Sequence, residues 1–294
     1  MGKTILLTGG TGFLGSNLLK RLVSDGYRVV ALKRSFSKLV RLETVLEDVR
    51  FYNLDDVPLA RVFEENAINL VVHCATNYGR RDVSPTEIIE ANLILPLHLL
   101  QLAEAHGCAG FINTDTILDK RVNHYSLSKK QFLDWLPLFS QKFVCANVAL
   151  EHFYGPFDDR SKFVTRIVLD LLDEVESIEL TPGEQKRDFI FIDDVVEAFV
   201  KVIEFAADAE HDIYRFEVGS NHKSAIREFV HLTKELVGNR TTRLVFGALP
   251  YRENEVMESN VDITELARLG WRPRVELKDG LIRTIELERN RLLR

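Results

Sequence analysis

A glycine-rich turn near the start of the chain restricts its possible folds more than any other feature. The apolar run 5–7 indicates a buried strand, three glycines follow it at intervals of three residues, and leucines then recur at helical spacing. A strand, glycine turn and helix in this order place the N–H groups of a helix N-terminus beside backbone that a phosphate can approach closely. The pattern predicts a dinucleotide site. Its candidate residues are Gly9, Thr11, Gly12, Phe13, Leu14 and Gly15.

Strand and helix patterns alternate through the first half of the chain. The expected strands are 5–8, 27–32, 50–54, 70–75, 110–113 and 143–148, and the expected helices are 13–24, 59–66, 86–107 and 126–140. This alternation implies a parallel sheet with right-handed crossovers. We therefore predict an α/β fold: a doubly wound parallel Rossmann sheet over 1–153, on which 186–206 packs back, and a smaller C-terminal substrate-binding region over 154–294.

Composition narrows the class of protein. The net charge of −6 argues against nucleic acid or an anionic membrane as a partner, and no apolar run reaches membrane-spanning length. The three cysteines, Cys74, Cys108 and Cys145, form no CxxC pair, which argues against a zinc site or a disulfide framework. We expect a cytoplasmic protein without a bound metal.

The end of the second expected strand bears on the type of dinucleotide. NAD-preferring Rossmann proteins place an acidic residue there to hold the ribose 2′-hydroxyl. This chain has Lys33 and Arg34 instead, and both cations suit a 2′-phosphate. The sequence therefore predicts NADP(H) as the cofactor.

Further motifs fall at intervals along nearly the whole chain. They are the TGxxGxxG turn at 8–15, His73-Cys74-Ala75, Ala91-Asn92, the YxxxK of Tyr125 and Lys129, Tyr154-Gly155-Pro156, and Arg187-Asp188-Phe189. Together they resemble the extended short-chain dehydrogenase/reductase family. The resemblance implies that Asp55 contacts the adenine, that Ala75, Thr76 and Asn92 belong to the cofactor site, and that Lys129 binds the nicotinamide ribose. Two helices beside the sheet commonly form a dimer interface in this family, so we expect a homodimer.

Tyr125 and Lys129 carry the expected chemistry. Four residues apart on a helix, they share one face. An ammonium beside the phenol, together with the positive ring of the oxidised cofactor, would lower the phenol pKa from about 10. The phenol could then give a proton to a carbonyl oxygen. The family adds a hydroxyl that polarises this carbonyl; Thr116 is the preferred candidate and Thr114 the alternative.

Segments in both halves of the chain are also similar to the CDP-abequose synthase family of sugar-nucleotide 4-ketoreductases. The resemblance implies NADPH-dependent reduction of the C4 ketone of a nucleotide-linked 4-keto deoxyhexose, in surface-polysaccharide synthesis. The substrate contacts that it suggests are Tyr78, Thr114, Glu151, His152, Phe163, Arg187 and Arg252. Two alternatives are a sugar-nucleotide 4-epimerase and a non-catalytic NADP-sensing protein. The sequence leaves the nucleotide base and the C4 stereochemistry open.

Overall fold

The computed structural model describes residues 2–80 and 82–293. The chain divides into two compact units. Unit 1 comprises Met1–Leu150, Val196–Glu217 and Thr264–Trp271, and unit 2 comprises Glu151–Val195, Val218–Ile263 and Arg272–Arg294.

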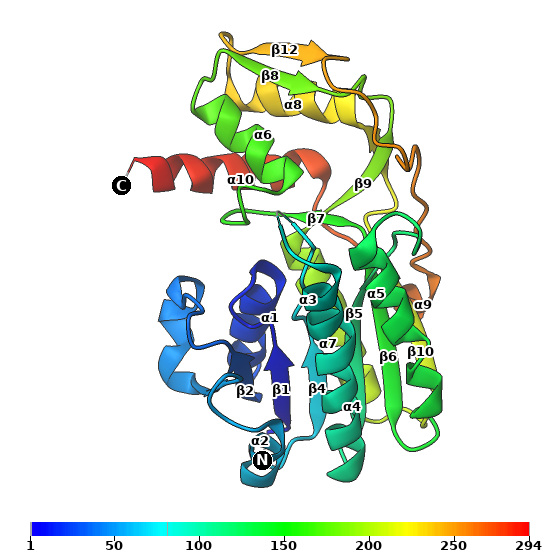
Figure 1. Cartoon of the computed structure of the whole chain (residues 1–294). Coiled ribbons are helices and arrows are strands. Elements are labelled where there is room, and N and C mark those ends of the chain that lie inside the picture. Colours follow the sequence, from blue (N-terminus) through cyan, green and yellow to red (C-terminus); the bar gives the residue numbers. More distant parts are fainter. Residues whose placement is uncertain (1, 81, 294) are drawn as a thin grey trace. The chain divides into compact units, whose positions relative to one another are not determined.

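A seven-stranded sheet forms the centre of unit 1, in the order β10-β6-β5-β4-β1-β2-β3 (Figure 1). Neighbouring strands from β3 to β6 are parallel. The strand order reverses between β1 and β4, and such a switch point is where doubly wound sheets bind ligands, outside the carboxyl ends of the strands. The strands are β1 (Thr4–Thr8), β2 (Arg28–Lys33), β3 (Val49–Asn53), β4 (Leu70–His73), β5 (Gly110–Thr116), β6 (Val144–Leu150) and β10 (Ile213–Val218).

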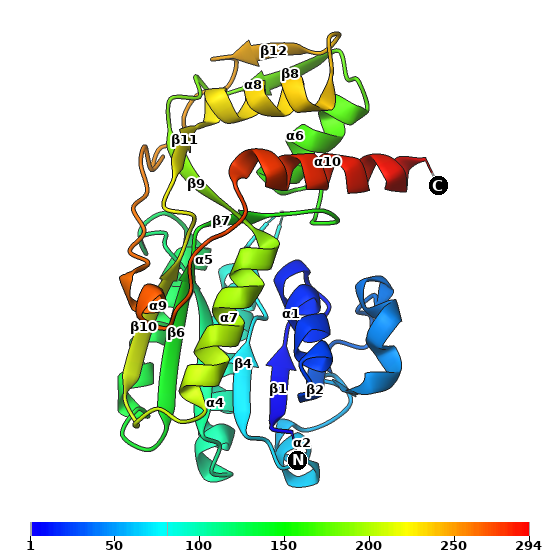
Figure 2. The ribbon, with the colours of Figure 1, turned by 180° about the vertical axis from the view of Figure 1, so that it is seen from behind.

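Helices cover both faces of this sheet. α4 and α5 lie on one face, and α1 and α7 lie on the other, where an Arg21–Glu197 ion pair joins them (Figures 1 and 2). The helices of unit 1 are α1 (Phe13–Ser24), η1 (Val40–Asp48), α2 (Leu59–Glu65), α3 (Pro85–Ile89), η2 (Glu90–Ile94), α4 (Leu95–Ala105), α5 (His124–Leu133), η3 (Leu136–Leu138), most of α7 (Ile192–Ala206) and α9 (Thr264–Arg268).

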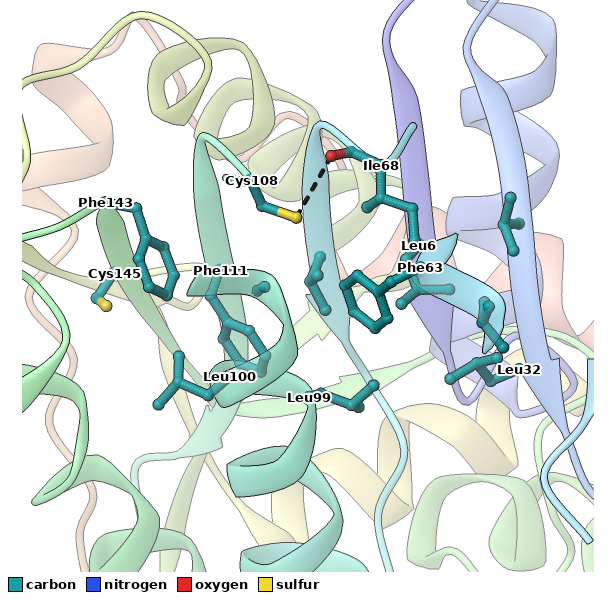
Figure 3. Close-up of a cluster of buried hydrophobic side chains, with 14 of the residues drawn as sticks. Leu6, Leu32, Phe63, Ile68, Leu99, Leu100, Cys108, Phe111, Phe143 and Cys145 are labelled. Atoms are coloured by element: carbon teal, nitrogen blue, oxygen red, sulfur yellow. Dashed lines mark hydrogen bonds between the residues drawn. The ribbon is translucent and has the colours of Figure 1, made fainter. Parts of the chain in front are cut away.

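Apolar residues of the sheet and of α2, α4, α5 and η3 form the core on the α4 face. Leu6 of β1, Leu99 of α4 and Phe132 of α5 are all fully buried in it. Figure 3 shows part of this cluster, including a hydrogen bond from the Cys108 Sγ to the carbonyl oxygen of Ile68. Because both sheet faces are covered, the central strands β1, β2 and β4 consist largely of consecutive buried apolar residues rather than alternating ones.

The helix expected over 86–107 consists of three consecutive helical segments: α3, the π-helical η2 and α4. Among the described residues, this stretch, Pro85–Ala105, has the length and apolar composition to span a membrane, which the sequence analysis did not anticipate. However, Leu99, Leu100 and Ala103 are fully buried in the core of unit 1. We therefore assign the helix to the core of this unit.

Unit 2 contains two small sheets and three longer helices. A three-stranded sheet has the order β11-β9-β7, and a two-stranded sheet pairs β12 with β8. α6 and α10 both pack against α8. The elements are β7 (His152–Tyr154), α6 (Phe163–Leu172), β8 (Ser177–Leu180), β9 (Lys186–Phe191), β11 (Lys223–Ala225), α8 (Ile226–Val237), β12 (Arg243–Phe246) and α10 (Leu277–Leu292).

The predicted Rossmann sheet is confirmed, and its first six strands begin and end within three residues of the expected positions. Two expectations were wrong in detail. β10, the seventh strand, lies beyond the part of the sequence assigned to the sheet. The helix expected to reach residue 140 ends at Leu133, and the short η3 follows it.

Candidate active site

The glycine turn after β1 is held tightly against neighbouring backbone. A Cβ atom at Gly9, where φ is +69°, would lie 2.6 Å from the amide nitrogen of Ala75. A Cβ atom at Gly15 would lie 2.1 Å from the carbonyl oxygen of Gly9, so α1 can approach the turn only with glycine there. α1 follows Gly12 with no side-chain cap and no acidic residue in its first turn. This arrangement fits a pyrophosphate group. Thr11 lies in the same turn, and Phe13 and Leu14 are the first two residues of α1.

The basic residues after β2 lie at the same edge of the sheet. The Lys33 ammonium donates to the Asn53 Oδ1 over 2.6 Å, and the Arg34 guanidinium lies 5.8 Å from the centre of the Phe36 ring. Asp55 accepts the Ser35 N–H over 2.6 Å. This bond, with smaller contributions from the nearby cations, lowers the pKa of the Asp55 carboxyl group. Asp55 thus holds the turn that carries the two cations.

Arg41 is a cation near the glycine turn that the sequence analysis missed. Its guanidinium donates to the carbonyl oxygen of Thr11 over 3.5 Å. Arg41 belongs to η1, which packs against α1. The only signal in the sequence was the spacing of basic residues at positions 33, 34, 38 and 41. The uncapped N-terminus of α1, the glycine turn and the nearby cations together fit the shape and the negative charge of the phosphate groups of a dinucleotide.

The segment after β4 is fastened to its neighbours by buried polar groups. The Thr8 Oγ1 accepts the Ala75 N–H over 3.1 Å and lies 2.9 Å from the Nδ1 atom of His73. Thr76 follows directly, half-buried. Asn92, in η2, accepts the N–H of Asn77 and donates to its carbonyl oxygen, both over 2.8 Å, and also donates to Ser128. The Asn92 amide therefore orders this segment through contacts with protein atoms.

Tyr125, Thr116 and Lys129 come together at the carboxyl end of β5. Burial is the largest influence on the pKa of the Tyr125 phenol and raises it, whereas Thr116 acts on the phenol in the opposite direction. The Tyr78 ring lies 5.1 Å from the Tyr125 ring, centre to centre. Lys129 is 1% exposed, and its ammonium donates to the carbonyl oxygen of Thr114 over 2.9 Å. The structure thus gathers the three predicted catalytic residues and Tyr78 in unit 1.

Burial sets the electrostatics of this group. Burial raises the pKa of the Tyr125 phenol, and the tyrosine Tyr78 raises it further. Burial lowers the pKa of the Lys129 ammonium to about 8. Burial therefore dominates the pKa of the phenol in this structure, and its lowering by Lys129 together with an oxidised cofactor stays a prediction.

The two candidate threonines have different partners. The Thr114 hydroxyl donates to the Cys74 Sγ over 3.3 Å, whereas the Thr116 Oγ1 accepts the Leu118 N–H over 3.3 Å and acts on the pKa of the Tyr125 phenol. Both lie on β5 and are largely buried. These contacts favour Thr116 as the hydroxyl that accompanies Tyr125.

The candidate substrate contacts of unit 2 form a buried polar cluster. Arg187, on β9, pairs with Glu255 and donates to the carbonyl oxygen of Lys186. Glu151 is 5% exposed, and one of its oxygens lies 3.0 Å from the Nδ1 atom of His152. Among the described residues, its other oxygen, Oε1, has no hydrogen-bond partner. Burial opposes ionisation of the Glu151 carboxyl group, but His152 and, less strongly, Ser259 lower its pKa.

Arg252 and Phe163 occupy different surroundings. Arg252 is exposed, and its charge acts on the Arg187 guanidinium, so the two cations lie within electrostatic range. The Phe163 ring lies 5.9 Å from the Phe229 ring, which in turn stacks on Phe189. Phe163 is therefore part of an aromatic cluster in unit 2. Within residues 2–80 and 82–293, no group of three His, Cys, Asp or Glu side chains is arranged to bind a metal.

Comparisons with known proteins agree on the type of molecule. Residues 5–219 match the NAD dependent epimerase/dehydratase family. The chain is 32% identical to a CDP-abequose synthase from Salmonella muenchen, over 98% of this chain and 99% of the relative. It is 26% identical to a UDP-glucose 4-epimerase from Mycolicibacterium smegmatis, over 97% and 98% of the two chains. Among solved structures, the UDP-glucose 4-epimerase of Thermotoga maritima with UDP-glucose has a TM-score of 0.86 at 26% identity, over 98% and 99% of the two chains.

Proposed function

This chain belongs to the NAD-dependent epimerase/dehydratase family, and within it we propose an NADPH-dependent reductase of a nucleotide-linked 4-keto deoxyhexose. The observation that carries the proposal is the gathering of Tyr125, Thr116 and the buried Lys129 ammonium at the carboxyl end of β5. The similarity to CDP-abequose synthases supports a CDP-linked substrate and a role in O-antigen or other surface-polysaccharide synthesis.

The cofactor would be held by the glycine turn and the basic residues after β2. The uncapped first turn of α1 would bind the pyrophosphate, and Lys33 and Arg34 would bind the 2′-phosphate. NADPH, when bound, supplies the hydride that reduces the ketone carbon. The lack of a carboxylate at the end of β2 supports NADP(H) over NAD(H).

Residues of this chain would supply the proton that the ketone oxygen takes up during the reduction. Burial keeps the Tyr125 phenol protonated at neutral pH, so it is a proton donor for the ketone oxygen. The Thr116 hydroxyl would donate a second hydrogen bond to that oxygen and orient the carbonyl. With a pKa of about 8, the Lys129 ammonium is charged near pH 7 and would stabilise the phenolate left after proton transfer.

The polar cluster of unit 2 supports a charged, hydroxyl-rich ligand. We propose that Arg187 and Arg252 bind the nucleotide part, because guanidinium groups suit diphosphate and ribose oxygens. The unpartnered oxygen of Glu151 would accept a hydrogen bond from a ligand hydroxyl or amino group. His152, beside it, would contact the same part of the substrate.

Following NADPH absorbance with purified protein and a panel of CDP-, dTDP-, UDP- and GDP-linked 4-keto sugars tests this proposal. We expect consumption of one NADPH per ketone, fastest with a CDP-linked sugar, and a product whose NMR spectrum contains a new proton at C4. No NADPH consumption with any member of the panel would refute the reductase.

A 4-epimerase is the second candidate, because the chain is also similar to UDP-glucose 4-epimerases over nearly its full length. An epimerase would retain its cofactor through purification. It would interconvert C4 epimers without added NADPH. The same panel, run with nucleotide sugars that carry a C4 hydroxyl, separates these two activities.

A further inference from the structure

β5 extends beyond its neighbour on one side. β4 pairs with β5 only as far as the match of His73 with Asn113, whereas β6 continues to the match of Leu150 with Thr116. The last three residues of β5 therefore have a strand partner on one side only. They are buried, and buried backbone groups without partners are strongly unfavourable.

Two consecutive lysines of α5 provide partners at this end of β5. The Lys129 ammonium donates to the Thr114 carbonyl oxygen over 2.9 Å, and the Lys130 ammonium donates to the Thr116 carbonyl oxygen over 2.6 Å. Carbonyl groups two residues apart in a strand point to the same side, so the two ammonium groups serve one edge of β5. Lys129 belongs to the predicted YxxxK pattern, but nothing in that pattern requires Lys130.

Asp115 completes the contacts of Lys130. Its carboxylate, whose side chain is 0% exposed, lies 2.8 Å from the Lys130 ammonium and accepts the Thr116 N–H over 2.7 Å. Asn147 of β6 donates to the same carboxylate over 2.9 Å. Both backbone polar groups of Thr116 are thus bound by one ion pair. These contacts occupy the Asp115 carboxylate, so it is not available as a general acid or base.

We propose that Asp115 and Lys130 are positioning residues, which take the place of a neighbouring strand where β4 has ended and fix the backbone of Thr116, whose hydroxyl acts beside the Tyr125 phenol in the proposed reaction. The kinetic part of this inference rests on the proposed reductase. A charged pair suits this role because it supplies a donor and an acceptor from side chains where β4 has ended.

A double substitution tests the pair without leaving a buried unpaired charge. We expect Asp115→Asn/Lys130→Met to lower kcat by about 30-fold, because misplacement of a contacting group by about 1 Å has effects of this size. The KM for NADPH should stay within about twofold, since the glycine turn and the residues after β2 are untouched. The control Lys201→Met/Glu204→Gln removes an exposed ion pair of α7 and should leave kcat unchanged.

The decisive measurement repeats the substitution in a Thr116→Val background. If the pair acts through Thr116, it has nothing left to position there, so the double substitution should lower kcat by less than about twofold. A further fall as large as in the wild-type background would overturn the proposal. So would a wild-type kcat in the double variant itself. Asp115→Asn alone, which preserves shape, is the milder second variant; we expect a loss of about threefold, again absent with Thr116→Val.

Methyl NMR separates this inference from the proposed function. The Thr116 methyl resonance can be assigned by its absence in Thr116→Val. We expect Asp115→Asn/Lys130→Met to shift or broaden it and the α7 control to leave it in place, whether or not any sugar is turned over. An unchanged resonance in the double variant would refute the positioning role. A wild-type protein that reduces no 4-keto sugar would refute the reductase alone.

Discussion

Buried charged side chains have different partners at the end of β5 and in unit 2. At the end of β5, the ammonium groups of Lys129 and Lys130 donate to carbonyl groups of the strand that carries Thr116. In unit 2, Arg187 pairs with Glu255. The next residue of β9, Asp188, accepts the N–H groups of Ser220 and Asn221 in one loop.

The difference concerns what the charges hold in place. In unit 1 they hold a strand end from which a proposed reactive hydroxyl projects. In unit 2 the paired groups join a strand to a loop, and Glu151 and Gln185 each retain an oxygen without a hydrogen-bond partner among the described residues. Damage to the first set should therefore change kcat, and damage to the second should change stability. The following substitutions test that contrast.

Tyr125→Phe should have the largest effect. The ring and its packing remain, but the proton donor is gone, so we expect kcat to fall by about 10³-fold or more. The Kd for NADPH, measured by fluorescence titration, should change less than about threefold. Tyr154→Phe is the matched control: its buried hydroxyl donates to the carbonyl oxygen of Leu277 in unit 2. Turnover that survives Tyr125→Phe would remove the phenol from the mechanism.

Glu255→Gln should lower stability rather than cofactor binding. The Arg187 guanidinium, with a side chain 10% exposed, would lose its carboxylate partner. Breaking a buried ion pair on one side costs about 3 kcal/mol, which urea unfolding measures. The exposed Glu204→Gln should change stability by less than about 0.5 kcal/mol. A normal unfolding curve for Glu255→Gln would contradict the structural role given to this pair.

Lys33→Ala/Arg34→Ala should change the choice of cofactor. Charge-assisted hydrogen bonds contribute about 1.5–3 kcal/mol, so we expect the KM for NADPH to rise by about 30-fold and that for NADH to stay nearly constant. Arg28→Ala, at the opposite end of β2, is the control. Equal losses with both cofactors would show that these cations do not distinguish a 2′-phosphate.

The titration of Lys129 should appear in the pH dependence of stability. Burial lowers its pKa to about 8 in the folded chain, from 10.5 in a solvated lysine. Between these values the unfolded state binds the extra proton, so the free energy of unfolding should rise with pH by about 1.4 kcal/mol per unit. That contribution is complete above pH 10.5 and lost as the pH falls through about 8. Urea unfolding of the wild type and of Lys129→Met at several pH values isolates the contribution of Lys129. If the free energies of unfolding of the two proteins changed with pH in parallel, the lowered pKa of Lys129 would be contradicted.

Local patterns in the sequence determined the elements and most of the candidate site in unit 1. Leucine spacing predicted α1, and glycine spacing predicted the turn that Gly9 and Gly15 form. These predictions succeeded because the conformational limits of glycine and the periodicities of helix and strand act over a few residues. The four-residue spacing of Tyr125 and Lys129 likewise placed them on one helix.

Only the tertiary structure decided how those side chains are held. The sequence could not reveal that β4 ends three residues before β5, and this difference is the reason that Lys129 and Lys130 bind strand carbonyls. Nor could it separate Thr116 from Thr114, because both hydroxyls depend on partners from distant segments. Where β4 ends relative to β5, and how deeply the Tyr125 phenol is buried, depend on packing between segments that are far apart in the sequence. No local pattern in the sequence contains that information.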